Sequence, residues 1–541
     1  MRMKYTQNIE RAAGILMAVS SLPSNYGIGT FGQEAYKFVD FVHECHHGYW
    51  QVLPLGPTTY GDSPYQAYSA FAGNPYFIDL DMLVDEGYIS LDKILEKDWG
   101  DGNVPVNVSE DEAKYGNYPH NFDVNLGHPN YVSYEKLFNA RLEVLKQAHK
   151  GFCLKRSESK ARLAKGLPLY KRFDNFMRDN AFWIRDYSLF MALKEKNEYK
   201  SWLEWDIDIQ KREAATLEKV SIELEEEIDF WNFIQFEFAS QWSKLKSYAN
   251  QKDVKIIGDI PIYVGLDSVD VWAHSDLFLL DENLTPTKVA GVPPDAFSDL
   301  GQKWGNPIYD YKKMKADGFE WWRKRIEKNS QLYDVIRIDH FLGIVKYYTI
   351  PAQNPDAREG AYEEGPGQDL LDVINEAKGD TVIIAEDLGV SLPEVTEILE
   401  YNDYPSMKVL EFAFGGDRKN PHLPYNYPAN CVVYGGTHDN ETLMGFLNDR
   451  GDCELGYAFD YLDTRDRRRM VDMVFREAYG SVAKLAIFTV QDILKLGNEA
   501  RMNTPSSMGN NWKWRMSRGQ LGEKEVNDMR YLASVFGRET Y

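Results

Sequence analysis

The chain has 541 residues, of which 43% are hydrophobic, so it is long enough for one barrel with large insertions or for two to three domains. Its formal net charge of −22 argues against a nucleic-acid partner and against binding to an anionic membrane, because an acidic surface repels phosphate groups. Aromatic residues make up 14% of the chain; most are expected in the core, but Tyr and Trp rings also suit a surface that stacks on sugar rings.

The N-terminal part contains an apolar run, Gly14–Val19, that could pass for the core of a secretory signal. The run is short and lacks a small-x-small cleavage pattern after it, so a first strand explains it better. No stretch of about 18 uncharged apolar residues predicts a membrane span. The four cysteines include no C-x-x-C pair, which predicts reduced thiols and a cytoplasmic location.

Short runs rich in β-branched or aromatic residues recur along the chain, with helical patterns such as Phe31–Cys45 and Leu392–Tyr401 between most of them. Strands that alternate with helices predict an α/β fold with a parallel sheet, and about eight such units predict a closed (β/α)8 TIM barrel. The expected strands are Gly14–Leu22, Tyr49–Leu55, Val254–Ile262, Val335–Asp339, Thr381–Glu386, Lys408–Phe414, Val432–Thr437 and Leu485–Val490.

The spacing of these strands is uneven, because no convincing barrel strand lies between Leu55 and Val254. A polar part, Asp101–Asn130, is followed by a strongly helical part, Tyr134–Asn250. We therefore expect a mainly helical subdomain, at about residues 80–250, inserted after strand two of a single catalytic barrel that spans residues 1–541. Large insertions of this kind are expected at the C-terminal face of the barrel, where active sites form.

Three of the expected strands end in an acid: Asp339, Glu386 and Asp439 follow strands four, five and seven. Side chains at the C-terminal ends of parallel barrel strands project into the same mouth. Arg337 stands two residues before Asp339 and should point the same way, keeping that acid ionised. The sequence thus predicts three carboxyl groups, with a guanidinium, at one face of the barrel.

Three carboxyl groups together suit the cleavage of a glycosidic bond, in which one carboxylate attacks the anomeric carbon and one carboxylic acid protonates the leaving oxygen. A third can accept hydrogen bonds from sugar hydroxyls, and His340 and His438 can donate to hydroxyls as neutral rings. An acid after a strand can also simply cap the next helix. The ordered set of three, with Arg and His neighbours, favours catalysis over capping.

These residues belong to segments through which the chain resembles the amylomaltases, the 4-α-glucanotransferases of glycoside hydrolase family 77, from about Gly14 to about Arg515. The segments that carry the resemblance are Asp62–Gln66, Ser69–Tyr76, Gly258–Val264, Pro293–Ser298, Gly301–Pro307, Arg337–Phe341, Ala385–Gly389, His438–Asn440, Gly497–Asn503 and Trp512–Arg515.

The resemblance implies that Asp339 is the nucleophile, Glu386 the general acid/base and Asp439 the stabiliser of the transition state. The substrate-binding residues that it implies are Ser63, Tyr65, Asp259, Trp304, Asn306, Arg337, His340 and His438. Tyr65 corresponds to an aromatic platform beside the cleaved sugar. Trp304 and Asn306 belong to a region, about residues 265–330, that is expected to cover the cleft.

Structural roles remain open for several of these residues: Tyr65 as a turn aromatic, Trp304 as an anchor of its own loop, and Asp259 as a buried support. Trp512 and Trp514 are expected to pack where the barrel closes. One departure from the family pattern is Leu342, where the family often has Arg after His-Phe. It leaves the reaction class unchanged, but any cleft contact or ion pair of that Arg is in doubt, and substrate preference with it.

Two other motifs favour structural interpretations. His43-Glu44-Cys45-His46-His47 spells H-E-x-x-H, but a strand is expected near Tyr49, which ends the helix too early, and no third ligand follows. The pattern Gly27-x-Gly29-x-x-Gly32 follows the first strand without the acidic partner of a dinucleotide site. We therefore expect no metal and no cofactor.

The sequence predicts a retaining transferase that moves a segment of an α-1,4-glucan to the 4-hydroxyl of another glucan or of glucose, so maltooligosaccharides are the expected substrates. The alternatives are an α-amylase-like retaining hydrolase, which would share the acids, and a glycan-binding protein without catalysis, which would not need all three. The choice of sugar over water as acceptor is implied by the resemblance alone. A monomer and a homodimer are both compatible with the sequence.

Overall fold

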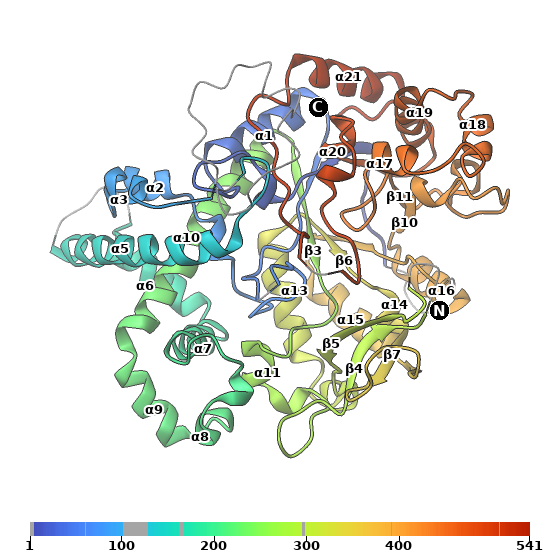
Figure 1. Ribbon diagram of the computed structural model, residues 1–541. Coiled ribbons are helices and arrows are strands. Elements are labelled where there is room, and N and C mark those ends of the chain that lie inside the picture. The colour runs from blue at the N-terminus through green and yellow to red at the C-terminus, as the bar shows by residue number, and fades with distance from the viewer. Residues whose placement is uncertain are drawn as a thin grey trace.

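The computed structural model describes residues 5–59, 61–100, 128–161, 167–294, 298–390, 392–507 and 509–540. At its centre eight parallel strands form one sheet in the order β10-β11-β12-β1-β2-β3-β6-β9. The Ala385 N–H donates to the Pro405 oxygen at 3.1 Å, so the two ends of this order meet and the sheet closes. The (β/α)8 TIM barrel predicted from the sequence is confirmed (Figure 1). Its strands are β1 (Ala12–Leu16), β2 (Tyr49–Gln51), β3 (Lys255–Ile260), β6 (Val335–Ile338), β9 (Val382–Ala385), β10 (Ser406–Val409), β11 (Cys431–Tyr434) and β12 (Leu485–Thr489).

Side chains fill the inside of the barrel, as the alternation of a strand requires. Leu16, Ile257, Ile384, Val432 and Ile487 come from five different strands and belong to one buried cluster that is separate from the main core outside the strands. The interior is therefore packed, and a substrate can be accepted only at the barrel mouth.

Helices cover the outside of the barrel. In α1, Ala35, Phe38, Val39 and Val42 are buried at helical spacing, which explains why this face packs on the strands. Pro393 opens α16, a position that suits its missing N–H. The covering helices are α1 (Gln33–Glu44), α13 (Glu320–Leu332), α15 (Gly367–Ala377), α16 (Pro393–Asn402), α17 (Leu443–Asn448), α18 (Gly456–Tyr461), α19 (Arg467–Gly480), α20 (Val490–Ile493) and α21 (Glu523–Val535).

A second group of helices lies between β2 and β3 and extends to one side of the barrel (Figure 1). It comprises η2 (Pro75–Phe77), α2 (Leu80–Asp85), α3 (Leu91–Leu95), α5 (Tyr134–Ala161), α6 (Leu169–Asp179), α7 (Ile184–Lys196), η4 (Trp202–Glu204), α8 (Ile207–Gln210), α9 (Ala214–Glu223) and α10 (Glu225–Gln251). Most of the polar segment Asp101–Asn130 falls outside the described residues. The boundaries of a subdomain at about 80–250 stay a prediction.

An antiparallel sheet of four strands, in the order β5-β4-β7-β8, was not expected from the sequence. Its strands are β4 (Lys288–Val292), β5 (Gln302–Pro307), β7 (Lys346–Pro351) and β8 (Ala361–Glu364). Short elements complete the described chain: η1 (Val19–Ser21), α11 (Val269–Ala273), η5 (Ser275–Leu277), α12 (Tyr311–Ala316), α14 (Leu342–Val345), η6 (Leu410–Phe412), η7 (Pro424–Asn426) and η8 (Asn498–Ala500). Residues 265–330 thus contain α11 to α13 besides β4 and β5, and their action as one cover stays a prediction.

The predicted strand Lys408–Phe414 is displaced in the structure, where β10 is Ser406–Val409 and the chain turns into η6 directly after it. The apolar residues 410–414 are buried in loops at the end of the strand, so hydrophobicity alone misplaced the strand. Similarly, β1 and β2 end at Leu16 and Gln51, earlier than expected, and buried loop residues follow them.

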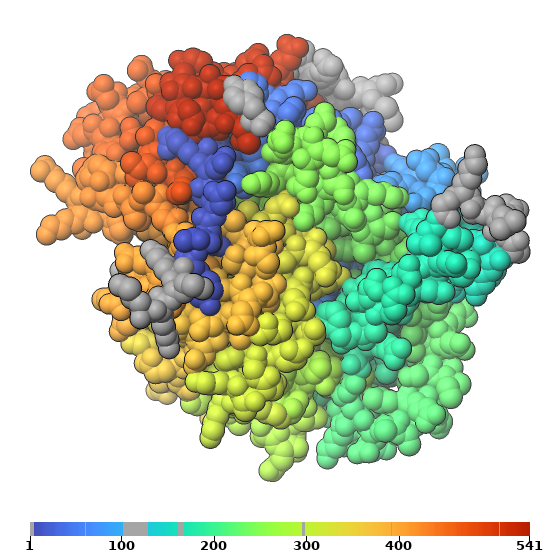
Figure 2. Space-filling view, turned by 180° about the vertical axis from the view of Figure 1, so that it is seen from behind, coloured from blue at the N-terminus to red at the C-terminus, as the bar shows by residue number. Residues whose placement is uncertain are grey.

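The N-terminal segment runs as a strip across the outside of the barrel (Figure 2). The Gln7 side chain donates to the Ile383 oxygen and accepts from the Ile383 N–H, which attaches the segment to β9. Among the described residues, no helix is long and apolar enough to cross a membrane.

Candidate active site

Asp339 directly follows β6 and shares one guanidinium with a second acid. Arg337 and Asp259 are neighbours in register on β6 and β3. Arg337 Nη1 lies 2.9 Å from Asp339 Oδ1 and 2.6 Å from Asp259 Oδ2. Burial, with the negative charges of Asp259 and Asp439, raises the pKa of Asp339 to about 6, although Arg337 opposes the shift. Asp339 is therefore mostly ionised at neutral pH and held in place by Arg337.

Glu386 directly follows β9 and is held by backbone groups. Its Oε2 accepts from the His340 N–H at 2.7 Å, and its Oε1 accepts from the Leu388 N–H at 2.9 Å. Burial, with the charge of Asp339, raises the pKa of Glu386 to about 8, while Arg337 and the two N–H groups limit the rise. Glu386 is therefore largely protonated at neutral pH, when Asp339 is not.

Asp439 lies in the turn after β11, with its side chain 44% exposed. Its Oδ1 accepts from Asn503 Nδ2 at 2.6 Å, and its Oδ2 lies 3.3 Å from His438 Nε2. Desolvation works against ionisation, but His438 and Asn503 outweigh it and lower the pKa of Asp439 to about 2. In return, Asp439 raises the pKa of His438 against the effect of burial. The third acid is thus an anion at neutral pH.

Aromatic rings stand beside the acids. The Tyr65 ring stacks on His438 at a centroid distance of 5.0 Å, and the Trp512 ring lies 5.7 Å from Tyr65. The Tyr65 hydroxyl donates to Asp259 Oδ2 at 2.8 Å, which joins the ring to the Arg337 network. Trp304, on β5, meets His340 edge-on at 4.8 Å. Burial lowers the pKa of His340 to about 4, so this ring is neutral.

Ser63 and Asn306 occupy supporting positions. The Ser63 hydroxyl accepts from the Tyr65 N–H at 3.3 Å. Asn306 is 4% exposed, and its amide donates to the Val264 oxygen at 2.8 Å and accepts from Gln66 Nε2 at 3.0 Å. The Asn306 amide therefore holds β5 against the loop that carries Tyr65.

Several residues near the acids were not assigned to the site from the sequence. Asn503 contacts the Asp439 carboxylate, and Arg501 donates to the Asp439 backbone oxygen at 2.9 Å. Trp512 joins the ring stack, and Gln66 pairs with Asn306. All four lie in segments that carry the family resemblance, but a segment does not tell which of its side chains reaches the acids.

Two sequence features away from the acids have structural explanations. α1 ends at Glu44, and the imidazoles of the H-E-x-x-H pattern contact separate partners: His43 Nδ1 the Lys252 oxygen, and His47 Nε2 the Tyr479 hydroxyl. Leu342, which departs from the family pattern, is 7% exposed and belongs to the main hydrophobic core.

The sequence and the fold were compared with known proteins. The sequence model of the family described as 4-alpha-glucanotransferase matches residues 17–521. The 4-alpha-glucanotransferase of Clostridium butyricum is 44% identical over 96% of this chain and 100% of that protein, and the one of Thermus thermophilus is 40% identical over 98% and 99%. The structure of an amylomaltase from Streptococcus agalactiae in complex with acarbose has a TM-score of 0.86 and 37% identity, and covers 98% of this chain and 100% of that chain. The chain therefore belongs to the 4-alpha-glucanotransferase family.

Proposed function

We propose that this 4-alpha-glucanotransferase transfers a segment of an α-1,4-glucan to the 4-hydroxyl of another glucan or of glucose, using Asp339 as nucleophile and Glu386 as acid and base. One observation carries the assignment of roles: the acids converge at the ends of β6, β9 and β11 with three different proton affinities. A nucleophile must be ionised and an acid protonated at the same pH, and the structure supplies this difference.

In the first step, Asp339 attacks the anomeric carbon while Glu386 gives its proton to the departing glycosidic oxygen. A covalent glucosyl-enzyme forms, and the leaving chain departs with the proton. In the second step, Glu386 takes the proton of an incoming 4-hydroxyl, whose oxygen attacks the anomeric carbon and releases Asp339. Two inversions retain the α configuration.

The neighbours of the acids have separate tasks in this proposal. Asp439, ionised and partly exposed, accepts hydrogen bonds from sugar hydroxyls and stabilises positive charge on the ring. Tyr65 and Trp304 offer faces for stacking, and the neutral His340 can donate to a hydroxyl. Arg337 holds Asp339 in place by an ion pair, and its guanidinium forms a second ion pair with Asp259.

An α-amylase-like hydrolase would use the same acids, and family membership favours transfer over it. The physical basis of transfer is an acceptor sugar held at high effective concentration while water is excluded. We further propose that maltooligosaccharides are donors and acceptors and that the enzyme acts in the cytoplasm. The four free thiols, of which Cys45 and Cys431 are buried, are compatible with that location.

Incubation with maltotriose alone tests the transfer. We expect glucose together with a ladder of longer maltooligosaccharides and little net gain of reducing ends, measured by chromatography and a reducing-sugar assay. Maltose and glucose without longer products would instead identify a hydrolase.

Asp339→Asn tests the nucleophile. The amide cannot attack, so we expect kcat to fall by at least about 1,000-fold while the circular dichroism spectrum and the melting temperature stay close to those of the parent. Asp356→Asn, in the loop between β7 and β8, is the matched control and should retain full activity. Near-normal turnover by Asp339→Asn would remove Asp339 from the mechanism.

A further inference from the structure

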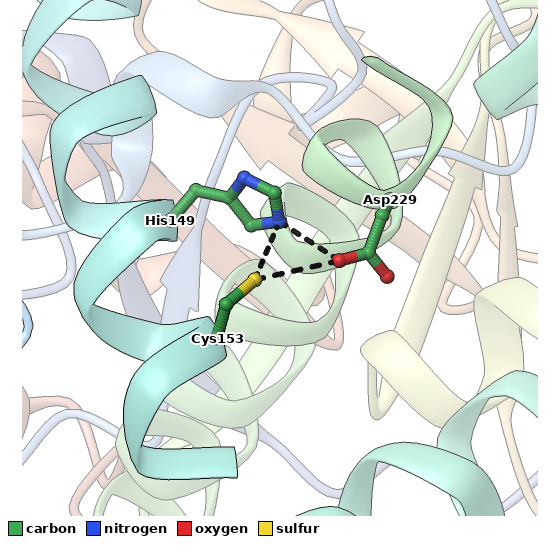
Figure 3. A group of neighbouring side chains, drawn as sticks. All are labelled: His149, Cys153 and Asp229. Atoms are coloured by element: carbon green, nitrogen blue, oxygen red, sulfur yellow. Dashed lines mark hydrogen bonds and ion pairs between the residues drawn. The ribbon is translucent and has the colours of Figure 1, made fainter. Parts of the chain in front are cut away.

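A histidine, a cysteine and an aspartate meet between two helices of the insertion, beside the barrel (Figures 1 and 3). His149 and Cys153 lie on α5, and Asp229 lies on α10. The His149 Nε2 atom is 3.0 Å from Asp229 Oδ2 and 3.2 Å from Cys153 Sγ, and Cys153 Sγ is 3.5 Å from the same Asp229 oxygen. Three donor atoms of different chemistry thus face one point.

The helices bring these atoms together for simple reasons. His149 and Cys153 are four residues apart and share one face of α5. The His149 ring is wedged against Phe230 and Phe233 of α10, at centroid distances of 5.8 and 5.5 Å, which fixes its orientation toward Asp229. The cluster is preorganised by packing and does not depend on loops.

The separations match those around a small tetrahedral cation. Zinc–nitrogen and zinc–oxygen bonds of about 2.0–2.2 Å and a zinc–sulfur bond of about 2.3 Å place neighbouring donors roughly 3.3–3.6 Å apart. The observed 3.0, 3.2 and 3.5 Å need adjustments of only a few tenths of an ångström. His, Cys and Asp are also ligand types that zinc accepts together.

The charges around the cluster act in both directions: the positive charge of Arg156 opposes a bound cation, and nearby carboxylates favour it. Arg156 holds both oxygens of Asp229, through Nη1 at 3.0 Å and Nη2 at 2.9 Å. The negative charge of Asp174 raises the pKa of Arg156, and the negative charge of Glu226 raises the pKa of the Cys153 thiol. The acidic first turn of α10, Glu225–Glu227, lies two to four residues before Asp229 and adds negative potential. A cation can take Oδ2 while Arg156 keeps Oδ1.

The cluster also has access to water. The side chain of Asp229 is 29% exposed, whereas that of His149 is 7% exposed. Three protein ligands with one side open to solvent leave room for a water molecule as the fourth ligand.

We propose that His149 Nε2, Cys153 Sγ and Asp229 Oδ2 bind a zinc-type divalent cation that ties α5 to α10. On binding, the Cys153 S–H bond breaks and its proton goes to solvent, while the proton on His149 Nε2 is exchanged through solvent for one on Nδ1, so the ring remains neutral. The thiolate, the imidazole Nε2 and the carboxylate then each donate an electron pair to the ion. No redox change takes place. The competing explanation is that the same residues form a metal-free network of hydrogen bonds with the Arg156 ion pair.

Zinc titration of the full chain, freed of metal with a chelator and reduced with a phosphine, decides between them. By calorimetry we expect one equivalent of Zn²⁺ to bind with a Kd below about 100 µM. Cys153→Ser and His149→Gln should each weaken this binding at least about 10-fold. Cobalt(II) added in place of zinc should give a thiolate charge-transfer band that Cys153→Ser lacks.

Cys453→Ser, which removes an exposed thiol elsewhere, is the matched control and should bind zinc and cobalt as the parent does. Circular dichroism without metal establishes that all variants are folded. No saturable binding below about 1 mM, or equal binding by Cys153→Ser, overturns the site. Zinc should also raise the melting temperature of the parent more than that of Cys153→Ser. If zinc binds but the two melting-temperature shifts are equal, the proposal that the ion ties α5 to α10 is overturned.

Discussion

The three acids differ in proton affinity because they have different partners, although each follows a barrel strand. Asp339 shares Arg337 with Asp259, so it receives only part of that positive charge. Glu386 has backbone N–H partners, and Asp439 has His438 and Asn503. Burial acts on all three, so the partners decide which acid stays protonated.

The pH dependence of kcat/KM should reflect this difference. Activity needs Asp339 ionised and Glu386 protonated, so the rate should fall below about pH 6, as Asp339 gains a proton, and above about pH 8, as Glu386 loses one. Initial rates with maltotriose across this range measure both limbs. With an α-maltosyl fluoride donor, whose leaving group needs no proton, the rate should no longer fall above about pH 8. Persistence of that fall with the fluoride would contradict the role of Glu386.

Tyr65→Phe isolates the hydroxyl that Asp259 accepts. The ring stack with His438 remains, but the buried Asp259 carboxylate loses one donor and Arg337 is drawn further toward it. We expect kcat to fall roughly 10- to 100-fold with little change in KM, because one lost hydrogen bond to a charged group costs about 1.5–3 kcal/mol.

The control for this change is Tyr68→Phe in the same loop, where the ring packs against Phe190 and activity should stay within about twofold. Equal losses in both variants would show a general loosening of the loop.

At the residue scale, the sequence predicted the acids at the barrel mouth and Arg337 as the partner of Asp339, but it missed Asn503 as a partner of Asp439. Asp339 and Glu386 stand at the ends of short apolar runs, so their place at the barrel mouth follows from strand geometry. Asn503 reaches Asp439 from a loop after β12, and no local pattern reports that approach. Substrate binding by Asn306 stays a prediction; in the structure its amide contacts Val264 and Gln66.

Among the elements, the loop after β1 shows why glycine is required at one place. A Cβ atom on Gly29 would lie 1.7 Å from the Val19 oxygen and 2.8 Å from the Leu22 N. Both neighbours are backbone atoms of η1 and its end, which cannot swing aside. Gly29 of the Gly-x-Gly-x-x-Gly pattern thus serves a close approach of two backbone segments, which agrees with the structural interpretation of that motif.

Gly29→Ala should therefore lower the free energy of unfolding by about 1–3 kcal/mol, the cost of overpacking. Gly456→Ala, at the start of α18 with open space around its Cβ position, is the control and should change stability by less than about 0.5 kcal/mol. Urea denaturation followed by fluorescence compares the two. Equal stabilities would mean that η1 can shift.

The elements also divide into those that the sequence predicts and those that it does not. Runs such as Val335–Ile338 are buried on both faces, so their apolar composition identifies them as parallel strands. β5 contains Gly305 and Pro307, and β8 is largely exposed, so neither resembles a strand locally. Pairing with β4 and β7 creates these strands, and such pairing is not visible along the chain.

In the whole molecule, Arg538 fastens the C-terminal segment to the base of the barrel. Its side chain is fully buried. Its guanidinium donates to six backbone oxygens, those of Ala12, Ala478, Tyr479, Ser481, Ala483 and Lys484.

Arg538→Leu should destabilise the protein by about 3–5 kcal/mol, because all hydrogen bonds of a fully buried guanidinium are lost at once, although Arg11 still donates to the Tyr479, Ser481 and Ala483 oxygens. Arg530→Leu, which removes an exposed bond to the Glu44 oxygen, should cost less than about 1 kcal/mol. Differential scanning calorimetry of both variants measures the contrast. A small effect of Arg538→Leu would mean that water satisfies these oxygens.

The pairing of β1 with β12, from Ala12 opposite Leu485 to Leu16 opposite Thr489, has a consequence for biosynthesis. β1 leaves the ribosome before the other barrel strands, and β12, one of its two neighbours in the sheet, is the last of the eight to be made. The nascent chain therefore carries an unpaired sheet edge until β12 has been made, and that edge is open to pairing with other chains. The barrel can close only after β12 has left the ribosome, so the yield of folded protein in a cell should depend on how long that edge is kept from aggregating.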